Sequence, residues 1–292
     1  MTHKSGFVNI IGHPNVGKST LMNALVGEKL SIITSKAQTT RHRILGIVND
    51  EQYQVIFSDT PGIIERPAYK MHELMNSFIQ TALVDADLLM VVIDVTEKTD
   101  YTQTVEKIRS SKVPVFVLLN KSDLSTQELM VEHIRQWEAW LPQAEVVPIS
   151  ATLGFNIDGL LERIVDRLPV SPAYYPKDEL TDRSMRFFVS EIIREKILIH
   201  YQQEIPYSVE VAVDSYEESA KLIKIRALIF VARESQKAIL IGKQGLAIKK
   251  VGIQAREDIE QFTGKKIFLE LSVKVVKDWR DNETVLKRFG YE

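Results

Sequence analysis

The sequence predicts two folded parts: an α/β domain built on a mostly parallel six-stranded sheet, and a smaller α+β domain after it. In the first half, short β-rich apolar runs alternate with helical patterns, which is the order that βαβ crossovers produce. A segment with three prolines, PVSPAYYP at 169–176, follows and shows no periodicity. Beyond it the order changes to α-β-β-α-α-β, so the second part is not a repeat of the first.

In the first part, short expected strands alternate with expected helices. The expected strands are Gly6–Ile11, Arg43–Asn49, Tyr53–Ser58, Leu88–Asp94, Val115–Leu119 and Glu145–Ile149. The expected helices lie near 18–27, 70–84, 101–111, 125–140 and 156–168. Because ligands bind at the carboxyl ends of parallel strands, functional motifs should come directly after these strands.

The second part is expected to begin with a long helix from about Thr181 to Gln203. Its other expected elements are strands Tyr207–Asp214 and Lys221–Ala232, a short helix, a helix over 245–261, a strand over 266–276 and a short terminal helix. The predicted domain limits are therefore 1–170 and 179–292, with a linker over 171–178.

Composition places the chain among ordinary globular proteins. Its 292 residues are 45% apolar and 26% charged, and no run approaches the ~18 apolar residues of a membrane span. The start, MTHKSGFVNIIGHP, is not a secretory signal, because its apolar run is too short. The chain has no cysteine, which excludes disulfides and thiolate metal sites. We expect a cytoplasmic, monomeric protein.

The net charge of −2 conceals a mild asymmetry between the two parts. Residues 1–170 hold 16 Lys and Arg against 20 Asp and Glu, whereas residues 171–292 hold 21 against 19. A balance of +2 is too small to indicate nucleic-acid binding, so the local clustering of basic residues matters more.

A phosphate-loop pattern, G-x-x-x-x-G-K-S, follows the first expected strand. The glycines let the backbone curl so that successive N–H groups face phosphate oxygens at a helix N-terminus. In this pattern Lys18 neutralises the β- and γ-phosphates, and the Ser19 hydroxyl binds Mg²⁺. The predicted nucleotide-binding residues here are Gly12, His13, Pro14, Asn15, Val16, Gly17, Lys18, Ser19 and Thr20.

The third expected strand ends at the pattern D-T-P-G. Asp59 is placed to hold Mg²⁺ through a water, and the Gly62 N–H to donate to the γ-phosphate. The predicted residues of this loop are Asp59, Thr60, Pro61, Gly62 and Ile63.

The fifth expected strand is followed by N-K-x-D, which selects the base. The Asp123 carboxylate can accept from both N1–H and the exocyclic amine of guanine, whereas adenine would leave it unpaired. After the last strand, a backbone N–H of Ser150-Ala151 can meet guanine O6. The predicted base-site residues are Asn120, Lys121, Ser122, Asp123, Ser150 and Ala151.

This ordered set of motifs resembles the translation-factor class of GTPases. The segment Gln38-Thr39-Thr40-Arg41-His42 is similar to the first switch loop of one bacterial family. That resemblance implies that a threonine ligates Mg²⁺ only when GTP is bound. Thr39 and Thr40 both offer a hydroxyl, and we favour Thr40, which gives Ser19, Thr40 and Asp59 as metal ligands.

Hydrolysis is expected to be slow. Where many GTPases place a water-orienting glutamine, this chain has Ile63, which cannot hydrogen-bond water. Asn15 resembles the asparagine that holds K⁺ in other GTPases, and K⁺ would offset transition-state charge. Its plain alternative is a turn residue. The predicted catalytic residues are Lys18, Thr40, Gly62 and Asn15.

The second part contains an acid-free basic stretch over 235–256 with a G-x-x-G loop at its centre. Such a loop between two helices, in the order α-β-β-α-α-β, resembles the type II KH domain, which clamps an RNA backbone. Small glycines permit close phosphate approach, and few aromatic residues lie nearby for base stacking. The predicted RNA-binding residues are Ile241, Gly242, Lys243, Gln244, Gly245, Lys249 and Lys250.

A GTPase domain joined to a KH domain resembles the Era family of bacterial GTPases. The likeness covers nearly the whole chain and includes QTTRHR, DRSMRFFVSEIIREK and IPYSV. It implies binding near the 3′ end of 16S ribosomal RNA, a role in assembly of the 30S subunit, and weak peripheral association with the inner membrane.

Two other functions stay open at this point. The chain could be an RNA-binding assembly factor that uses GTP as a structural ligand, since Ile63 argues against rapid turnover. It could also be a signalling GTPase whose second domain docks a protein.

Overall fold

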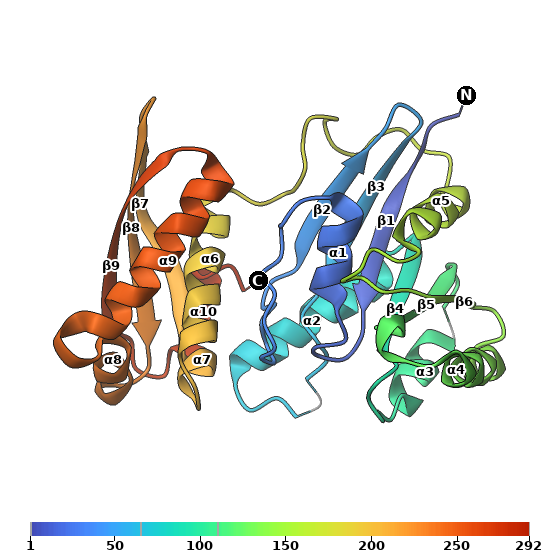
Figure 1. The fold of residues 1–292 in the computed structure, drawn as a ribbon, viewed down its shortest axis with the longest axis horizontal. Coiled ribbons are helices and arrows are strands. Elements are labelled where there is room, and N and C mark those ends of the chain that lie inside the picture. Colours follow the sequence, from blue (N-terminus) through green and yellow to red (C-terminus); the bar gives the residue numbers. More distant parts are fainter. Residues whose placement is uncertain (1, 65, 110, 292) are drawn as a thin grey trace. The chain divides into compact units, whose positions relative to one another are not determined.

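A computed structural model of the chain describes residues 2–64, 66–109 and 111–291 (Figure 1). Contacts divide it into two units. The first contains the ranges 1–31, 40–65 and 75–182, and the second contains 32–39, 66–74 and 183–292. Within the described ranges, no helix is both long enough and apolar enough to span a membrane.

The first unit contains the expected mostly parallel sheet. Its six strands lie in the order β2-β3-β1-β4-β5-β6, and only β2 runs antiparallel to its neighbour. The strands are β1 (Lys4–Ile11), β2 (Ile44–Asn49), β3 (Tyr53–Asp59), β4 (Leu88–Asp94), β5 (Val115–Asn120) and β6 (Glu145–Pro148). The fold class predicted from the alternating pattern is confirmed.

Helices cover both faces of this sheet (Figure 1). Leu89, Val91 and Ile93 of β4 belong to one hydrophobic cluster with residues of α2, α3 and α4. The alternate residues of the same strand are equally buried, so its other face is covered too. The helices are α1 (Lys18–Val26), α2 (Lys70–Val84), α3 (Thr102–Arg109), the 3₁₀ turn η1 (Ser122–Leu124), α4 (Gln127–Trp140) and α5 (Ile157–Arg167).

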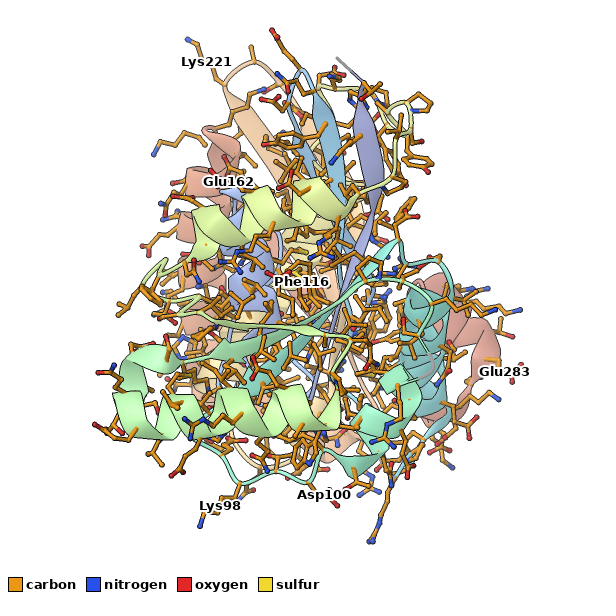
Figure 2. The ribbon with its side chains drawn as sticks, turned by 90° about the vertical axis from the view of Figure 1, so that its right-hand side faces the viewer. Lys98, Asp100, Phe116, Glu162, Lys221 and Glu283 are labelled. Carbon is orange, nitrogen blue, oxygen red and sulfur yellow. The ribbon has the colours of Figure 1, made fainter. Side chains whose placement is uncertain are left out.

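The strand order places the predicted motifs close together at the carboxyl ends of neighbouring strands. β1 lies between β3 and β4, and the register pairs Ile10 with Asp59 and Asp94 with Asn120. The strand ends that carry the motifs are therefore neighbours, which is where doubly wound sheets bind ligands. Phe116 of β5, labelled near the centre of Figure 2, is buried.

The segment expected as a linker is held against the first unit. The Gln54 side-chain oxygen accepts from the backbone N–H groups of Tyr174 and Tyr175 at 2.8 and 3.0 Å. The Ile47 N–H donates to the Leu180 carbonyl at 2.8 Å, beyond the edge strand β2. The Ile47 bond occupies a backbone group of the edge strand that would otherwise be left without a partner strand.

The second unit has the expected element order, with one error at its first strand. That strand was predicted over Tyr207–Asp214 but spans Glu210–Glu218, because Ile205–Ser208 forms a helical turn with Pro206 in its first turn. The elements are α6 (Met185–His200), α7 (Ile205–Ser208), β7 (Glu210–Glu218), β8 (Leu222–Val231), α8 (Glu234–Ile241), η2 (Lys243–Gly245), α9 (Leu246–Thr263), β9 (Lys266–Val275), η3 (Trp279–Asp281) and α10 (Glu283–Arg288).

One face of the β7-β8-β9 sheet forms the core of this unit. Alternate residues of β8 are buried in one cluster with α6 and α9, whereas Lys224 and Arg226 between them are exposed. A strand with this alternation has one face on the core and the other in solvent. β9 lies at the edge, so its outer backbone groups pair with no strand of the described chain.

Residues 32–39 contact α6 within the second unit. The buried Arg194 donates to the Thr39 carbonyl and pairs with Glu191, whose Oε1 lies 2.7 Å from Arg194 Nε. The Ile33 N–H donates to Glu195 Oε1 at 3.3 Å. Because side chains of α6 bind the backbone of this segment, its path depends on the helix.

Candidate functional site

The loop after β1 needs glycine at two positions. Gly12 and Gly17 have φ of 154° and 99°, which other residues rarely adopt. A Cβ on Gly12 would lie 2.6 Å from the Val92 carbonyl oxygen, and one on Gly17 would clash with Asn120 Nδ2. The backbone therefore curls tightly just before α1 begins at Lys18. The N–H groups at the start of α1 and its positive dipole end favour an anion here.

Lys18 is buried beneath this loop. Its Nζ donates to the carbonyl oxygens of Gly12 and His13 at 3.0 and 2.8 Å. Burial lowers the pKa of Lys18 to about 8, although the nearby Asp59 carboxylate opposes this shift. A phosphate anion would supply the charge that this desolvated ammonium needs.

The three predicted metal ligands meet at the start of α1. Ser19 Oγ donates to Asp59 Oδ2 at 2.7 Å and lies 2.9 Å from Thr40 Oγ1. Burial raises the pKa of Asp59. Hydrogen bonds from neighbouring hydroxyls and the positive charge of Lys18 lower this pKa, but by less than burial raises it. A positive ion bound at this carboxylate would lower the pKa of Asp59 and keep the carboxylate ionised.

The donor set fits Mg²⁺. Asp59 Oδ1 is buried and has no hydrogen-bond partner in the described part of the chain. Magnesium prefers hydroxyl and carboxylate oxygens and keeps several waters, which an unpartnered carboxylate oxygen can bind. Of the two candidate threonines, Thr40 lies at this cluster, whereas the Thr39 hydroxyl lies 2.6 Å from Thr34 Oγ1 and donates to the Lys36 carbonyl.

The loop after β3 passes close to the loop after β1. A Cβ on Gly62 would lie 2.8–2.9 Å from Pro14 atoms, two of them backbone, so only glycine fits. The neighbouring Thr60 donates from Oγ1 to the Ile10 carbonyl at 2.9 Å, which ties this loop to β1. This placement suits the predicted contact between the Gly62 N–H and a terminal phosphate.

Ile63 faces a hydrophobic cluster. Its partly buried side chain packs against the residues that α2, α3 and α4 bury over β4 and β5. An aliphatic side chain in that position offers no hydrogen bond to an attacking water.

The side chain of Asn120 links three of the predicted loops. Its Nδ2 donates to the Val16 carbonyl at 2.8 Å, and its Oδ1 accepts from the Ala151 N–H at 3.0 Å. Ser150 and Ala151 are buried, and the Asp123 side chain remains exposed. An exposed carboxylate beside fixed loops can accept from both N–H groups of a guanine edge.

Asp94 belongs to this site, although it lies in none of the predicted motifs. It ends β4 with only 1% of its surface exposed and forms an ion pair with Lys121. Burial favours its neutral form, but hydrogen bonds from Lys121 and Thr96 outweigh burial and lower the pKa of Asp94. A buried carboxylate at a strand end next to the other motifs was the signal that could have found it.

The predicted RNA-binding loop connects α8 and α9 through η2. Gly242 and Gly245 have φ of 70° and 75°, and Gln244 between them is also left-handed at 53°. A Cβ on Gly242 would lie 2.6 Å from the Ala247 Cβ, whereas Gly245 faces open space. Lys243, Gln244, Lys249 and Lys250 are exposed. The turn and its neighbouring lysines are therefore accessible, as contact with an RNA backbone requires.

A groove of about 300 Å³ lies between β9 and α9, the helix that follows this loop. Its walls combine apolar side chains with the cations Lys249 and Arg256. Lys250, on the other hand, does not line the groove. An apolar floor with a basic rim fits unpaired bases on a phosphate backbone.

Comparison with known proteins agrees with this geometry. A family model described as a 50S ribosome-binding GTPase matches residues 7–121, and a KH domain model matches 204–280. The GTPase Era of Staphylococcus haemolyticus is 43% identical over 292 residues, which cover 99% of this chain and 97% of that protein. The chain belongs to the Era family of GTPases.

Other members of the Era family extend the comparison. The chloroplastic GTPase ERA1 of Zea mays is 45% identical over 99% of this chain and 71% of its own length. A crystal structure of a single-substitution variant of Aquifex aeolicus Era bound to GDP and AlF₄⁻ has a TM-score of 0.93 at 37% identity, with 99% of both chains covered. This chain is therefore a GTPase with a KH domain, as its motifs predicted.

Proposed function

We propose that this chain is a slowly hydrolysing GTP switch that binds 16S ribosomal RNA and acts in assembly of the 30S subunit. A solved Era structure in complex with MgGDPNP and nucleotides 1506–1542 of 16S ribosomal RNA has a TM-score of 0.93 and covers 99% of this chain. The observation that carries the proposal is that an anion site and a basic groove along the helix that follows a G-x-x-G loop occur in one chain. The two-domain division at 1–170 and 179–292 belongs to this proposal.

The residues of the first site have separate roles in the proposed reaction. Lys18 and the N-terminus of α1 hold the β- and γ-phosphates, and Ser19, Thr40 and Asp59 hold Mg²⁺. The metal, when bound, supplies charge that offsets the charge developing on the phosphoryl oxygens. The Gly62 N–H donates to the γ-phosphate, which makes the loop after β3 sensitive to whether that phosphate is present.

Slow intrinsic turnover follows from Ile63, which packs against the hydrophobic cluster and cannot orient water. We propose that K⁺ held at Asn15 contributes charge in the transition state. Asn15 is exposed in the loop after β1 with φ of 63°. Turnover measured in KCl and in NaCl tests this part, since equal rates would remove K⁺ from the mechanism. Asn15→Ala should abolish any difference between the two salts.

Turnover with and without an RNA fragment from the 3′ end of 16S ribosomal RNA tests the switch. Stimulation by the fragment supports it, because RNA binding must then act on the nucleotide site. Turnover that is unmeasurable under both conditions contradicts it. That result would favour an assembly factor that uses GTP as a structural ligand, which Ile63 also favours.

Paired lysine variants test RNA binding. Lys243→Ala with Lys249→Ala should weaken binding of the RNA fragment about tenfold or more and reduce the salt dependence of its affinity. Lys221→Ala with Lys224→Ala removes the same charge from exposed positions outside the groove and should change affinity far less. Unchanged RNA affinity in Lys243→Ala with Lys249→Ala would favour a protein-docking role for the second unit.

We place the protein in the cytoplasm as a monomer, with weak peripheral association with the inner membrane. Fractionation of cells at low and high salt tests that association, because electrostatic binding to lipid headgroups weakens as salt rises.

A further inference from the structure

Ser31 lies beside the proposed metal site but belongs to none of its motifs. The residue has 1% of its surface exposed, and its hydroxyl lies close enough to the Asp59 carboxylate to lower the pKa of Asp59 against the larger effect of burial. Ser31 Oγ nevertheless has no hydrogen-bond partner in the described chain. Asp59 Oδ1 is likewise buried and unpartnered there. Two adjacent buried oxygens without partners are costly unless a bound group satisfies both.

The position of Ser31 is set by α1, the helix that carries Ser19. Asn23 Oδ1 accepts from the backbone N–H groups of Leu30 and Ser31 at 3.0 and 2.9 Å, and its Nδ2 donates to the Ser31 carbonyl at 2.8 Å. Ser19 and Asn23 are four residues apart on α1 and therefore share one face of the helix. One helix thus carries the Ser19 hydroxyl and, through Asn23, holds the backbone of Ser31.

This clamp does not include the segment that follows it. All three Asn23 bonds end at Leu30 and Ser31, which precede residues 32–39. The backbone of Ser31 can therefore stay in place whether or not the loop carrying Thr40 moves. Ser31 can serve the metal in the diphosphate state, when Thr40 is expected to be absent from it.

We propose that Ser31 is a positioning residue of the Mg²⁺ site, where its hydroxyl and Asp59 Oδ1 accept hydrogen bonds from one metal-bound water. A hydroxyl can accept from that water and still donate to the neighbouring carboxylate. Outer partners of this kind orient metal-bound groups and typically change metal affinity 10- to 100-fold. The inference rests on the Mg²⁺ site proposed above, and Asn23 positions Ser31 for this role.

The test is the Mg²⁺ dependence of release of a fluorescent GDP analogue from the full chain. In Ser31→Ala, we expect the Mg²⁺ concentration at half-maximal slowing of release to rise about tenfold. The release rate in excess chelator should match the wild type, which also shows that the nucleotide site is folded. Ser35→Ala removes an exposed hydroxyl from the neighbouring segment and should leave both quantities unchanged.

Asn23→Ala extends the test from the hydroxyl to its clamp. It should also raise the Mg²⁺ midpoint, and adding Ser31→Ala should cause little further change, because both act through one hydroxyl. A wild-type midpoint in Ser31→Ala would overturn the inference, as would faster release by the same factor in chelator. If release of the GDP analogue from the wild type does not depend on Mg²⁺, that result would instead contradict the metal site and, with it, the proposed function.

Discussion

Asn120 Nδ2 donates a hydrogen bond to the Val16 carbonyl at 2.8 Å, across 104 residues of sequence. The other side-chain atom of Asn120 accepts from Ala151 N at 3.0 Å. One buried amide thus joins the phosphate loop, the base loop and the loop after β6, and its two partners lose their bonds together when it is removed.

Asn120→Ala should therefore weaken GDP binding strongly. The substitution removes two hydrogen bonds and leaves two buried backbone groups without a partner, which costs about 2–4 kcal/mol. That cost corresponds to roughly a 30- to 700-fold fall in GDP affinity. Titration calorimetry with GDP measures the change. Asn49→Ala, at the opposite end of the sheet, is the matched control and should retain GDP affinity. An Asn120→Ala affinity within about threefold of the wild type would contradict the structural role.

Asp123→Asn should change the base that the site prefers. The amide donates where the carboxylate accepted, so it faces the exocyclic amine of guanine with like polarity. Xanthine carries an oxygen at that position, and an asparagine can donate to it while accepting from N1–H. GDP affinity should fall about 100-fold or more, and xanthosine diphosphate should bind the variant more tightly than GDP. Competition between the two diphosphates gives the ratio, and an unchanged preference for GDP would refute the assignment.

Gly62→Ala should separate the triphosphate from the diphosphate state. The added Cβ would meet Pro14 Cα and N at 2.9 Å, so one of the two loops must move. Because Gly62 is proposed to contact only the γ-phosphate, affinity for a non-hydrolysable GTP analogue should fall about tenfold or more, while GDP affinity changes little. Equal losses for both nucleotides would show that the clash distorts the whole phosphate loop.

Lys18 predicts a pH dependence of GDP binding. Its pKa of about 8 in the free site is below the ordinary lysine value of 10.5, and phosphate contact raises it, so binding takes up a proton above pH 8. Affinity should fall about threefold from pH 7.5 to 8.5 as the ammonium titrates. Lys18→Ala should bind weakly and lose this dependence, whereas Lys29→Ala, which changes an exposed lysine, should keep it. A flat profile for the wild type would contradict the lowered pKa.

The sequence predicted the fold class because its signals are local. Alternating apolar runs and helical patterns defined β1 to β6 within a few residues, and β8 by its alternation. The first strand of the second unit was wrong, because strand propensity around Tyr207 gave way to a turn begun at Pro206. Such boundaries depend on packing that short-range patterns do not contain.

The sequence by itself determined which chemical groups serve the nucleotide, since the motifs require particular residues at fixed spacing after a strand. The tertiary structure decided which residues outside the motifs join them. Asp94 meets Lys121 because β4 and β5 are neighbours, and Asn23 holds the backbone of Ser31, whose hydroxyl lies near Asp59. Hydrogen bonds and ion pairs between distant residues follow from strand order and helix position, which no local pattern encodes. The metal-site role of Ser31 could therefore be inferred only from the folded chain.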